Sequence, residues 1–204
     1  MELPGENPML LAKPFKSVAL ISLLCLPLTA LADWQLDGGN SSVQFVSVKK
    51  STIAETHHFK GLSGKISDSG NANVDIELAS VETNIPIRNE RMQKMLFDTA
   101  KYARAAITAQ VDAEQLKALA PGKSLSVTTD LSLDVHGAQK THKAQLQVTG
   151  LENGGLLVTS TAPIVINAGD FQLLEGIEKL REIAGLDSIS PIVPVTVKLV
   201  FTKQ

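Results

Sequence analysis

Apolar and polar residues alternate along most of the chain, which is the pattern of β-strands with one buried and one solvent-facing side. The longest such run covers residues 125–135, where every second residue is apolar or Thr and the others are Ser, Thr or Asp. A second run covers residues 142–148, and the short segment 136–139 connects the two. We therefore predict that the two runs form a β-hairpin.

Further alternating runs predict more strands, at residues 43–48, 59–66, 74–78, 107–111, 156–161 and 193–201. Turn-forming residues separate several of them, at 67–71, 121–122 and 153–155. About eight short strands of this kind favour an antiparallel sandwich or a closed barrel over a parallel sheet. A barrel has the further advantage that it leaves no strand edge unpaired.

Two segments have a helical period instead. Residues 88–98 place Met92, Met95 and Leu96 at helical spacing, which predicts a short helix between two strands. Residues 170–184 predict a longer helix, with Asp170 as N-cap, Gly185 as terminator and an apolar stripe. The stripe consists of Phe171, Leu174, Ile177, Leu180 and Ala184. Each helix is expected to pack on the outside of the sheet or, alternatively, to cap one mouth of a barrel.

The N-terminal segment has the three-part layout of a secretory signal peptide. Lys13 and Lys16 precede an apolar stretch at residues 17–28, and the small-x-small sequence 30–32 predicts cleavage after Ala32. The apolar stretch is shorter than the roughly 20 residues of a transmembrane helix. No other segment of the sequence is long and apolar enough to span a bilayer. The sequence therefore predicts a signal peptide at 1–32 and one exported domain at 33–204, without a transmembrane span.

Composition narrows the function further. The single cysteine, Cys25, lies in the segment expected to be removed, so disulfides, thiolate metal sites and a cysteine nucleophile are excluded from the exported domain. Nineteen Lys and Arg against 21 Asp and Glu give a net charge of -2. Because the basic residues are few and scattered, nucleic-acid binding is not expected.

The residue patterns of common catalytic sites are missing. Adjacent His57 and His58 would point to opposite faces of a strand, and no carboxylate is fixed by sequence beside His136 or His142. In Gly61-Leu62-Ser63-Gly64 the second glycine lies one position too early for a nucleophile elbow, and no helical run follows. No phosphate loop or dinucleotide fingerprint occurs either, so we predict no catalytic residues, no metal site and no cofactor. A hydrolase or isomerase that uses His136 or His142 remains an alternative.

An apolar interior is what the pattern does predict. A closed barrel of about eight strands has a lumen that is either filled by its own side chains or holds one small ligand. The inward residues are mostly aliphatic and few aromatics are available, which favours a hollow tube, although a sandwich core of the same residues would be solid. The predicted lining residues are Phe45, Val74, Ile76, Leu78, Ile107, Leu131, Leu133, Val135, Val195, Val197 and Leu199.

Several motifs resemble one family. They are Trp34-Gln35-Leu36-Asp37 with Ser41-Ser42-Val43-Gln44-Phe45, Ser80-Val81-Glu82-Thr83-Asn84, Arg88-Asn89-Glu90-Arg91-Met92, Phe97-Asp98, Tyr102, and Leu131 to Lys140 with its His-Gly pair. In their order and spacing these residues resemble the YceI-like family of exported bacterial proteins that bind polyisoprenoids. The chain departs from that pattern at Asn89, where Asp is usual, at Ala103, where Pro is usual, and in the long 170–184 segment followed by Pro191 and Pro194.

The resemblance implies an antiparallel, eight-stranded, lipocalin-like β-barrel with an apolar channel, in a periplasmic protein without catalytic residues. We therefore expect a non-enzymatic carrier of a long apolar amphiphile, such as a polyisoprenoid, a quinone or a fatty amide. Arg88 and Arg91 could hold an anionic head group through charge-assisted hydrogen bonds. The alternative is a secreted stress or interaction protein with a filled barrel and no small ligand. The oligomeric state stays open, a homodimer included.

Overall fold

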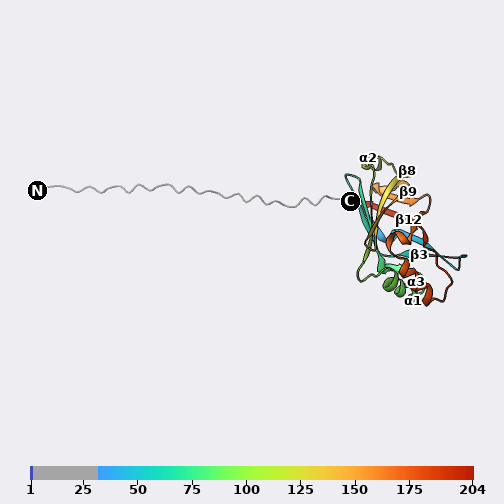
Figure 1. Ribbon diagram of the computed structural model, residues 1–204. Helices are drawn as coiled ribbons and strands as arrows, with labels where there is room; N and C mark the ends of the chain where they lie inside the picture. The colour runs from blue at the N-terminus through green and yellow to red at the C-terminus, as the bar shows by residue number, and fades with distance from the viewer. Residues whose placement is uncertain (2–31) are drawn as a thin grey trace.

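The computed structural model describes Met1 and residues 32–204, so the expected signal peptide lies outside the described residues apart from its two ends. The described chain forms one antiparallel sheet in which eight strands close into a ring (Figure 1), because the first strand pairs with the last. In chain order these are β1 (Ala32–Leu36), β4 (Leu62–Ser67), β5 (Asn71–Glu77), β7 (Arg104–Gln110), β8 (Ser124–Val135), β9 (Ala138–Gly150), β10 (Leu156–Ser160) and β12 (Ile192–Lys203). The predicted eight-stranded antiparallel barrel is confirmed.

Shorter strands lengthen the barrel at one end. The first half of β12 pairs with β11 (Ile164–Asn167) on one side and with β2 (Ser42–Lys49) on the other. From β2 the sheet continues through β3 (Ile53–Phe59) to the two-residue strand β6 (Val81–Glu82). The β2–β3 hairpin projects from the body beside α3 in Figure 1. The interior therefore extends beyond the closed ring along β12.

The predicted hairpin is the β8–β9 pair, which is in register from Ser124 opposite Thr149 to Val135 opposite Ala138. Its connection has two residues, His136 and Gly137, instead of the expected four. Both residues have positive φ angles, 53° and 77°. A two-residue turn of this kind matches the right-handed twist of the strands, and glycine is the residue that adopts it at least cost.

The single strand expected at residues 59–66 is wrong. Phe59 ends β3 and Leu62 begins β4, because the chain leaves the sheet at Lys60 and Gly61. There the Lys60 N–H donates to the carbonyl of Ser80, and the Gly61 carbonyl accepts from the Glu77 N–H. The strand expected at 74–78 ends one residue early, since Leu78 begins the 3-10 turn η2 (Leu78–Ser80). Similar turns occur at η1 (Gly38–Asn40) and η4 (Glu152–Gly154).

The first predicted helix is present but starts earlier. Helix α1 (Pro86–Arg91) has a proline in its first turn and continues directly into a π-helical turn, η3 (Met92–Leu96). At the other end of the barrel lies α2 (Ala113–Lys117), which the sequence pattern does not predict and which is capped by the Asp112 side chain. The helices therefore lie at both ends of the barrel (Figure 1).

The helix expected at 170–184 is present but begins later than predicted. The segment consists of the 3-10 turn η5 (Ala168–Phe171) and α3 (Leu174–Ile183), separated by Gln172 with a left-handed φ of 59°. Asp170 is not the N-cap, because Asn167 caps η5 and no side chain caps α3. The break allows Phe171 to be fully buried while α3 packs on η3. No helix of the described chain is long and apolar enough to cross a membrane.

Candidate functional site

A cavity of about 260 Å³ runs inside the barrel. Among the described residues that line it, every side chain except those of Thr129 and His142 is apolar. The volume is just below the range of roughly 300–1,000 Å³ that is common for small-molecule sites. The interior is thus neither a solid core nor a water-filled polar channel.

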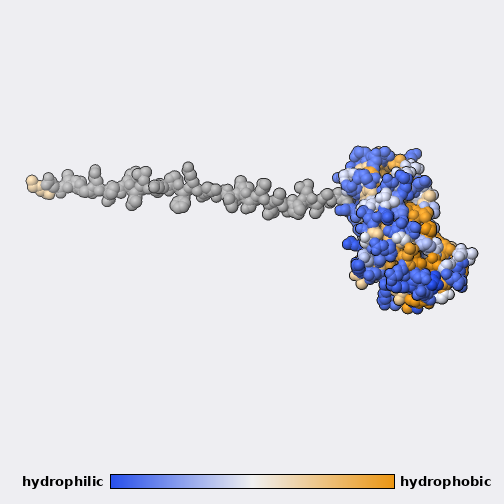
Figure 2. Space-filling view, in the orientation of Figure 1, coloured by the Kyte–Doolittle hydropathy of each residue, from blue (hydrophilic) through white to orange (hydrophobic). Residues whose placement is uncertain are grey.

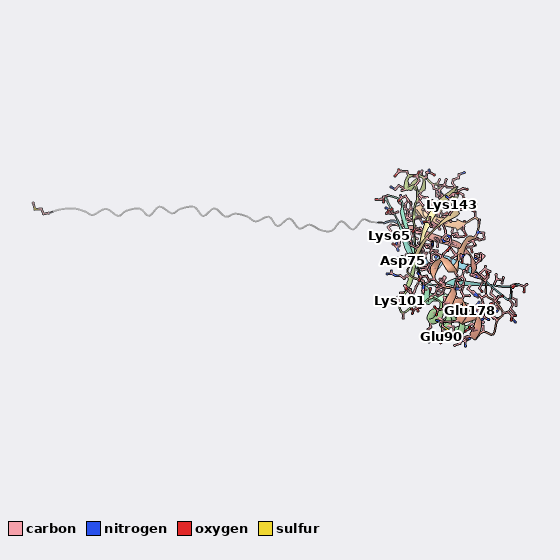
Figure 3. All side chains as sticks on the ribbon, in the orientation of Figure 1. Lys65, Asp75, Glu90, Lys101, Lys143 and Glu178 are labelled. Atoms are coloured by element: carbon pink, nitrogen blue, oxygen red, sulfur yellow. The ribbon has the colours of Figure 1, made fainter. Side chains whose placement is uncertain are left out.

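The lining follows from strand alternation, because successive side chains point to opposite faces of the sheet. Along β12 the odd-numbered residues from Val193 to Phe201 line the cavity. On the outer face of the β8–β9 hairpin, Asp130 pairs with Lys143 at 3.0 Å. Lys143 and the other labelled charged residues lie around the outside of the molecule in Figure 3.

All eleven residues predicted as channel lining contact this cavity. They come from β2, β5, η2, β7, β8 and β12. In each of these elements, the residues predicted to point inward line the cavity in the structure. Leu131, Leu133, Val195 and Val197 keep partial exposure, which is consistent with space beside them. That these side chains contact a ligand stays a prediction.

The two ends of the cavity are formed by residues outside the predicted lining. Leu96 and Phe97 from the end of η3, together with Phe171, Leu173 and Ile177, line it at one end. Leu116 of α2 also lines the cavity. Phe171 and Ile177 belong to the stripe predicted for 170–184, and of its two interpretations the cap agrees with their position. The sequence pattern of the stripe does not indicate whether it packs on the outside of the sheet or caps the barrel.

His142 is a polar residue inside this apolar cavity. It lies opposite Leu131 in the β8–β9 pair, and its ring stacks on Phe171 with 6.0 Å between ring centroids. Its Nε2 atom is buried and has no hydrogen-bond partner among the described residues. Thr129, the other polar lining residue, donates from Oγ1 to the carbonyl of Gln110 at 3.3 Å.

The remaining histidines do not form a site with it. His57 and His58 point to opposite faces of β3, as predicted, and Nε2 of buried His57 lies 2.9 Å from Oγ of Ser47. Burial, followed by the charge of Arg88, lowers the pKa of His57. His136, in the β8–β9 turn, packs on the ring of Tyr102. No group of three or more potential metal ligands occurs in the described part of the chain.

The two arginines proposed for an anionic head group lie on α1, and neither lines the cavity. Arg88 donates to Oε2 of Glu55 at 2.9 Å and to the carbonyl of Thr83 at 2.7 Å. Lys49 also binds Glu55, and its hydrogen bond, together with the positive charges of Arg88 and Lys49, lowers the pKa of Glu55. Arg91 is half-buried and has no ion pair with a described residue. Arg91 is therefore the less engaged of the two cations.

Exposed apolar side chains surround the helical end of the barrel. Ile87 of α1, Met95 of η3 and Leu174 and Ile183 of α3 are between 38% and 52% exposed. Figure 2 shows hydrophobic surface at this end and along the side of the body that faces away from the N-terminal trace. The elements that close this end of the cavity thus also present an apolar outer surface.

A family model described as the YceI-like domain matches residues 34–201. The chain belongs to the YceI-like family. This YceI-like domain is similar in structure to a polyisoprenoid-binding domain from Saccharophagus degradans, implicated in plant cell wall breakdown, with a TM-score of 0.84 and 40% sequence identity. The alignment covers 85% of this chain and all of that domain.

Other structures share the fold of this YceI-like domain at lower identity. BcnA from Burkholderia cenocepacia aligns with a TM-score of 0.60 and 21% identity, over 81% of this chain and 98% of that protein. A mutant YceI protein from Campylobacter jejuni aligns with a TM-score of 0.50 and 17% identity, over 72% of this chain and 84% of that protein. No curated protein matches the sequence.

Proposed function

We propose that this YceI-like domain is a periplasmic, non-enzymatic binding protein that encloses the tail of one long apolar amphiphile, such as a polyisoprenoid, a quinone or a fatty amide. The observation that carries the proposal is the cavity, whose lining is apolar except for Thr129 and His142. Burial of the tail would drive binding at roughly 25 cal/mol per Å² of apolar surface. The Saccharophagus degradans domain, whose description names polyisoprenoid binding, supports the same class of ligand.

The cavity offers little for catalysis. A hydrolase would need a nucleophile and a base within hydrogen-bonding distance. His142 has no hydrogen bond to a carboxylate among the described residues, and the Thr129 hydroxyl donates to a backbone carbonyl. These contacts favour a carrier or scavenger over an enzyme. For an amphiphile with an anionic head, Arg91 and Arg88 on α1 would supply the positive charge outside the cavity.

The test is to produce the full chain in an exporting bacterial host and to measure the periplasmic protein by native mass spectrometry, with lipid extraction and identification. We expect a mature chain that begins at Asp33 and carries one long-chain lipid. Val197→Trp should displace the lipid, because Val197 lines the cavity. Thr196→Trp is the matched control, since the neighbouring Thr196 is exposed on the other face of β12. A ligand-free protein that also fails to bind added prenyl alcohols, prenyl phosphates, quinones and fatty amides would contradict the proposal.

One observation favours a second candidate, a secreted interaction protein without a small ligand. The apolar residues exposed on α1, η3 and α3 form a surface of the kind that contacts other proteins. This candidate predicts that Leu174→Glu abolishes association with a partner, whereas Val197→Trp leaves it intact. If the protein is instead a carrier, Val197→Trp should abolish lipid binding and Leu174→Glu should leave it intact.

A further inference from the structure

The buried Nε2 atom of His142 points to a ligand group that the apolar lining by itself would not select. A polar atom buried without a hydrogen bond carries the full cost of its lost hydration, so such atoms are rare and call for an explanation. Here the unpartnered nitrogen belongs to a side chain that lines the cavity, and its ring stacks on the fully buried Phe171. A ligand in the cavity is in a position to supply the missing partner.

Thr129 lies on the same inner face of the β8–β9 hairpin. It pairs with Ala144, whereas His142 pairs with Leu131, so the two polar side chains are diagonal cross-strand neighbours. The Thr129 hydroxyl uses its proton on the Gln110 carbonyl and keeps its capacity to accept a hydrogen bond. The imidazole and the hydroxyl thus form one small polar patch in the cavity.

The same patch argues against a charged head group at this depth. No Lys or Arg side chain is among the described residues that line the cavity, and both arginines of α1 lie outside the lining. A phosphate or carboxylate beside His142 would lose its hydration without gaining a cationic partner, which is far more costly than burying a hydroxyl or carbonyl that is hydrogen-bonded.

We propose that His142, assisted by Thr129, is a specificity-determining residue that hydrogen-bonds an uncharged oxygen-containing group of the bound amphiphile, a hydroxyl or a carbonyl, inside the barrel. This inference rests on the proposed function, because it requires a ligand in the cavity. A hydroxyl satisfies either tautomer of the imidazole, since it both donates and accepts a hydrogen bond.

The test uses three probes with a common C20 isoprenoid chain: geranylgeraniol, geranylgeranyl monophosphate and the corresponding hydrocarbon without oxygen. Affinities are measured on delipidated mature protein by displacement of a fluorescent fatty probe. We expect the wild type to bind the alcohol more tightly than the phosphate. His142→Phe should weaken alcohol binding about three- to tenfold, the loss of one hydrogen bond, and leave hydrocarbon binding unchanged. Thr129→Val should have a smaller effect in the same direction.

His58→Phe is the matched control, because His58 is a partly exposed histidine of β3 that does not line the cavity. A second measurement requires no variant: the ¹⁵N resonance of His142 Nε2 should shift on addition of geranylgeraniol and stay in place with the hydrocarbon. An unchanged alcohol-to-hydrocarbon ratio in His142→Phe, or tighter binding of the phosphate by the wild type, would overturn the role of His142 while leaving the carrier function intact. Failure of the fluorescent fatty probe, the three isoprenoids, quinones and fatty amides to bind the wild type would overturn the carrier function itself.

Discussion

Asn89 of α1 donates a hydrogen bond from Nδ2 to Oε1 of Glu82 at 2.9 Å. Its Oδ1 atom accepts from the backbone N–H of Thr83 at 2.9 Å and from the Thr83 hydroxyl at 2.6 Å. The side chain thus needs both a donor and an acceptor, and an amide supplies both. This is the position at which the family pattern usually has Asp. In this chain the Asn amide can donate a hydrogen bond to the Glu82 carboxylate, which an Asp carboxylate could not do.

Asn89→Asp should therefore destabilise this protein. The new carboxylate would face Glu82 without the N–H₂ group, and we expect a loss of about 1–2 kcal/mol in the free energy of unfolding at pH 7. Like-charge repulsion raises the pKa of both carboxyls, so the loss should shrink as the pH falls and they are protonated. Urea unfolding at pH 7 and pH 4 measures this. Asn73→Asp is the control, because Asn73 has no side-chain hydrogen bond among the described residues; equal losses in both variants would contradict the assignment.

Glu82 itself makes stability depend on acid pH. The Lys60 ammonium at 2.6 Å, followed by the Asn89 amide and the Asn84 backbone N–H, lowers the pKa of Glu82 from 4.5 to about 2. Because the folded-state pKa is depressed, the stabilisation is present above about pH 4.5 and is lost as the pH falls towards 2. Glu82→Gln should lower the urea midpoint at pH 7, and the difference from wild type should vanish near pH 2. Glu152→Gln is the control, because Glu152 is exposed and has no side-chain ion pair with a described residue.

The turn of the β8–β9 hairpin should be sensitive to a single methyl group. Gly137 has a φ of 77°, and a Cβ atom there would lie 3.1 Å from Cε1 of Tyr102. Gly137→Ala should cost about 1–3 kcal/mol, because a strained backbone and a tight contact coincide. Thermal unfolding followed by circular dichroism measures the loss. Gly122→Ala is a useful comparison, since its φ is 75° but a Cβ atom there would meet nothing within 4 Å, so a smaller loss is expected.

Replacement of Gly176 by Ala should have the opposite effect on stability from the same change at an ordinary helical glycine. In an exposed helix Gly→Ala gains up to about 1 kcal/mol. Here the Cβ would lie 2.7 Å from the Met95 carbonyl oxygen and 2.8 Å from Leu96 Cα, so α3 would be pushed away from η3. We expect Gly176→Ala to destabilise the protein by about 1–3 kcal/mol and to weaken lipid binding, because Leu96 and Ile177 line the cavity. A higher melting temperature in this variant would show that α3 does not depend on the close approach.

The barrel and part of its lining can be predicted from the sequence because strand alternation is a local signal. Once residues 125–135 are assigned to a strand, Leu131, Leu133 and Val135 must share a face, and the apolar face is the inner one. The same argument places Val195, Val197 and Leu199 correctly inside. It identifies these positions without any knowledge of which strands are neighbours.

The segments that close the ends of the cavity cannot be predicted in this way. Gln172 interrupts the helical pattern with a left-handed backbone that its sequence context does not require, so Phe171 turns into the barrel for reasons of tertiary packing. The alternation places His142 on a strand, but a strand histidine carries no local signal of what surrounds its ring. Its importance becomes visible only when the apolar surroundings and the absence of a partner for Nε2 among the described residues are known.

The pairing of β12 with β1, β2, β10 and β11 also has a kinetic consequence. Strand β12 follows the other ring strands in the chain and joins the two sides of the ring, and its partners in β1 and β2 are more than 140 residues away along the chain. Contacts between such distant segments carry a large loop-closure entropy and form slowly. Ring closure therefore has to wait until β12 has been synthesised, and before that point the sheet stays open.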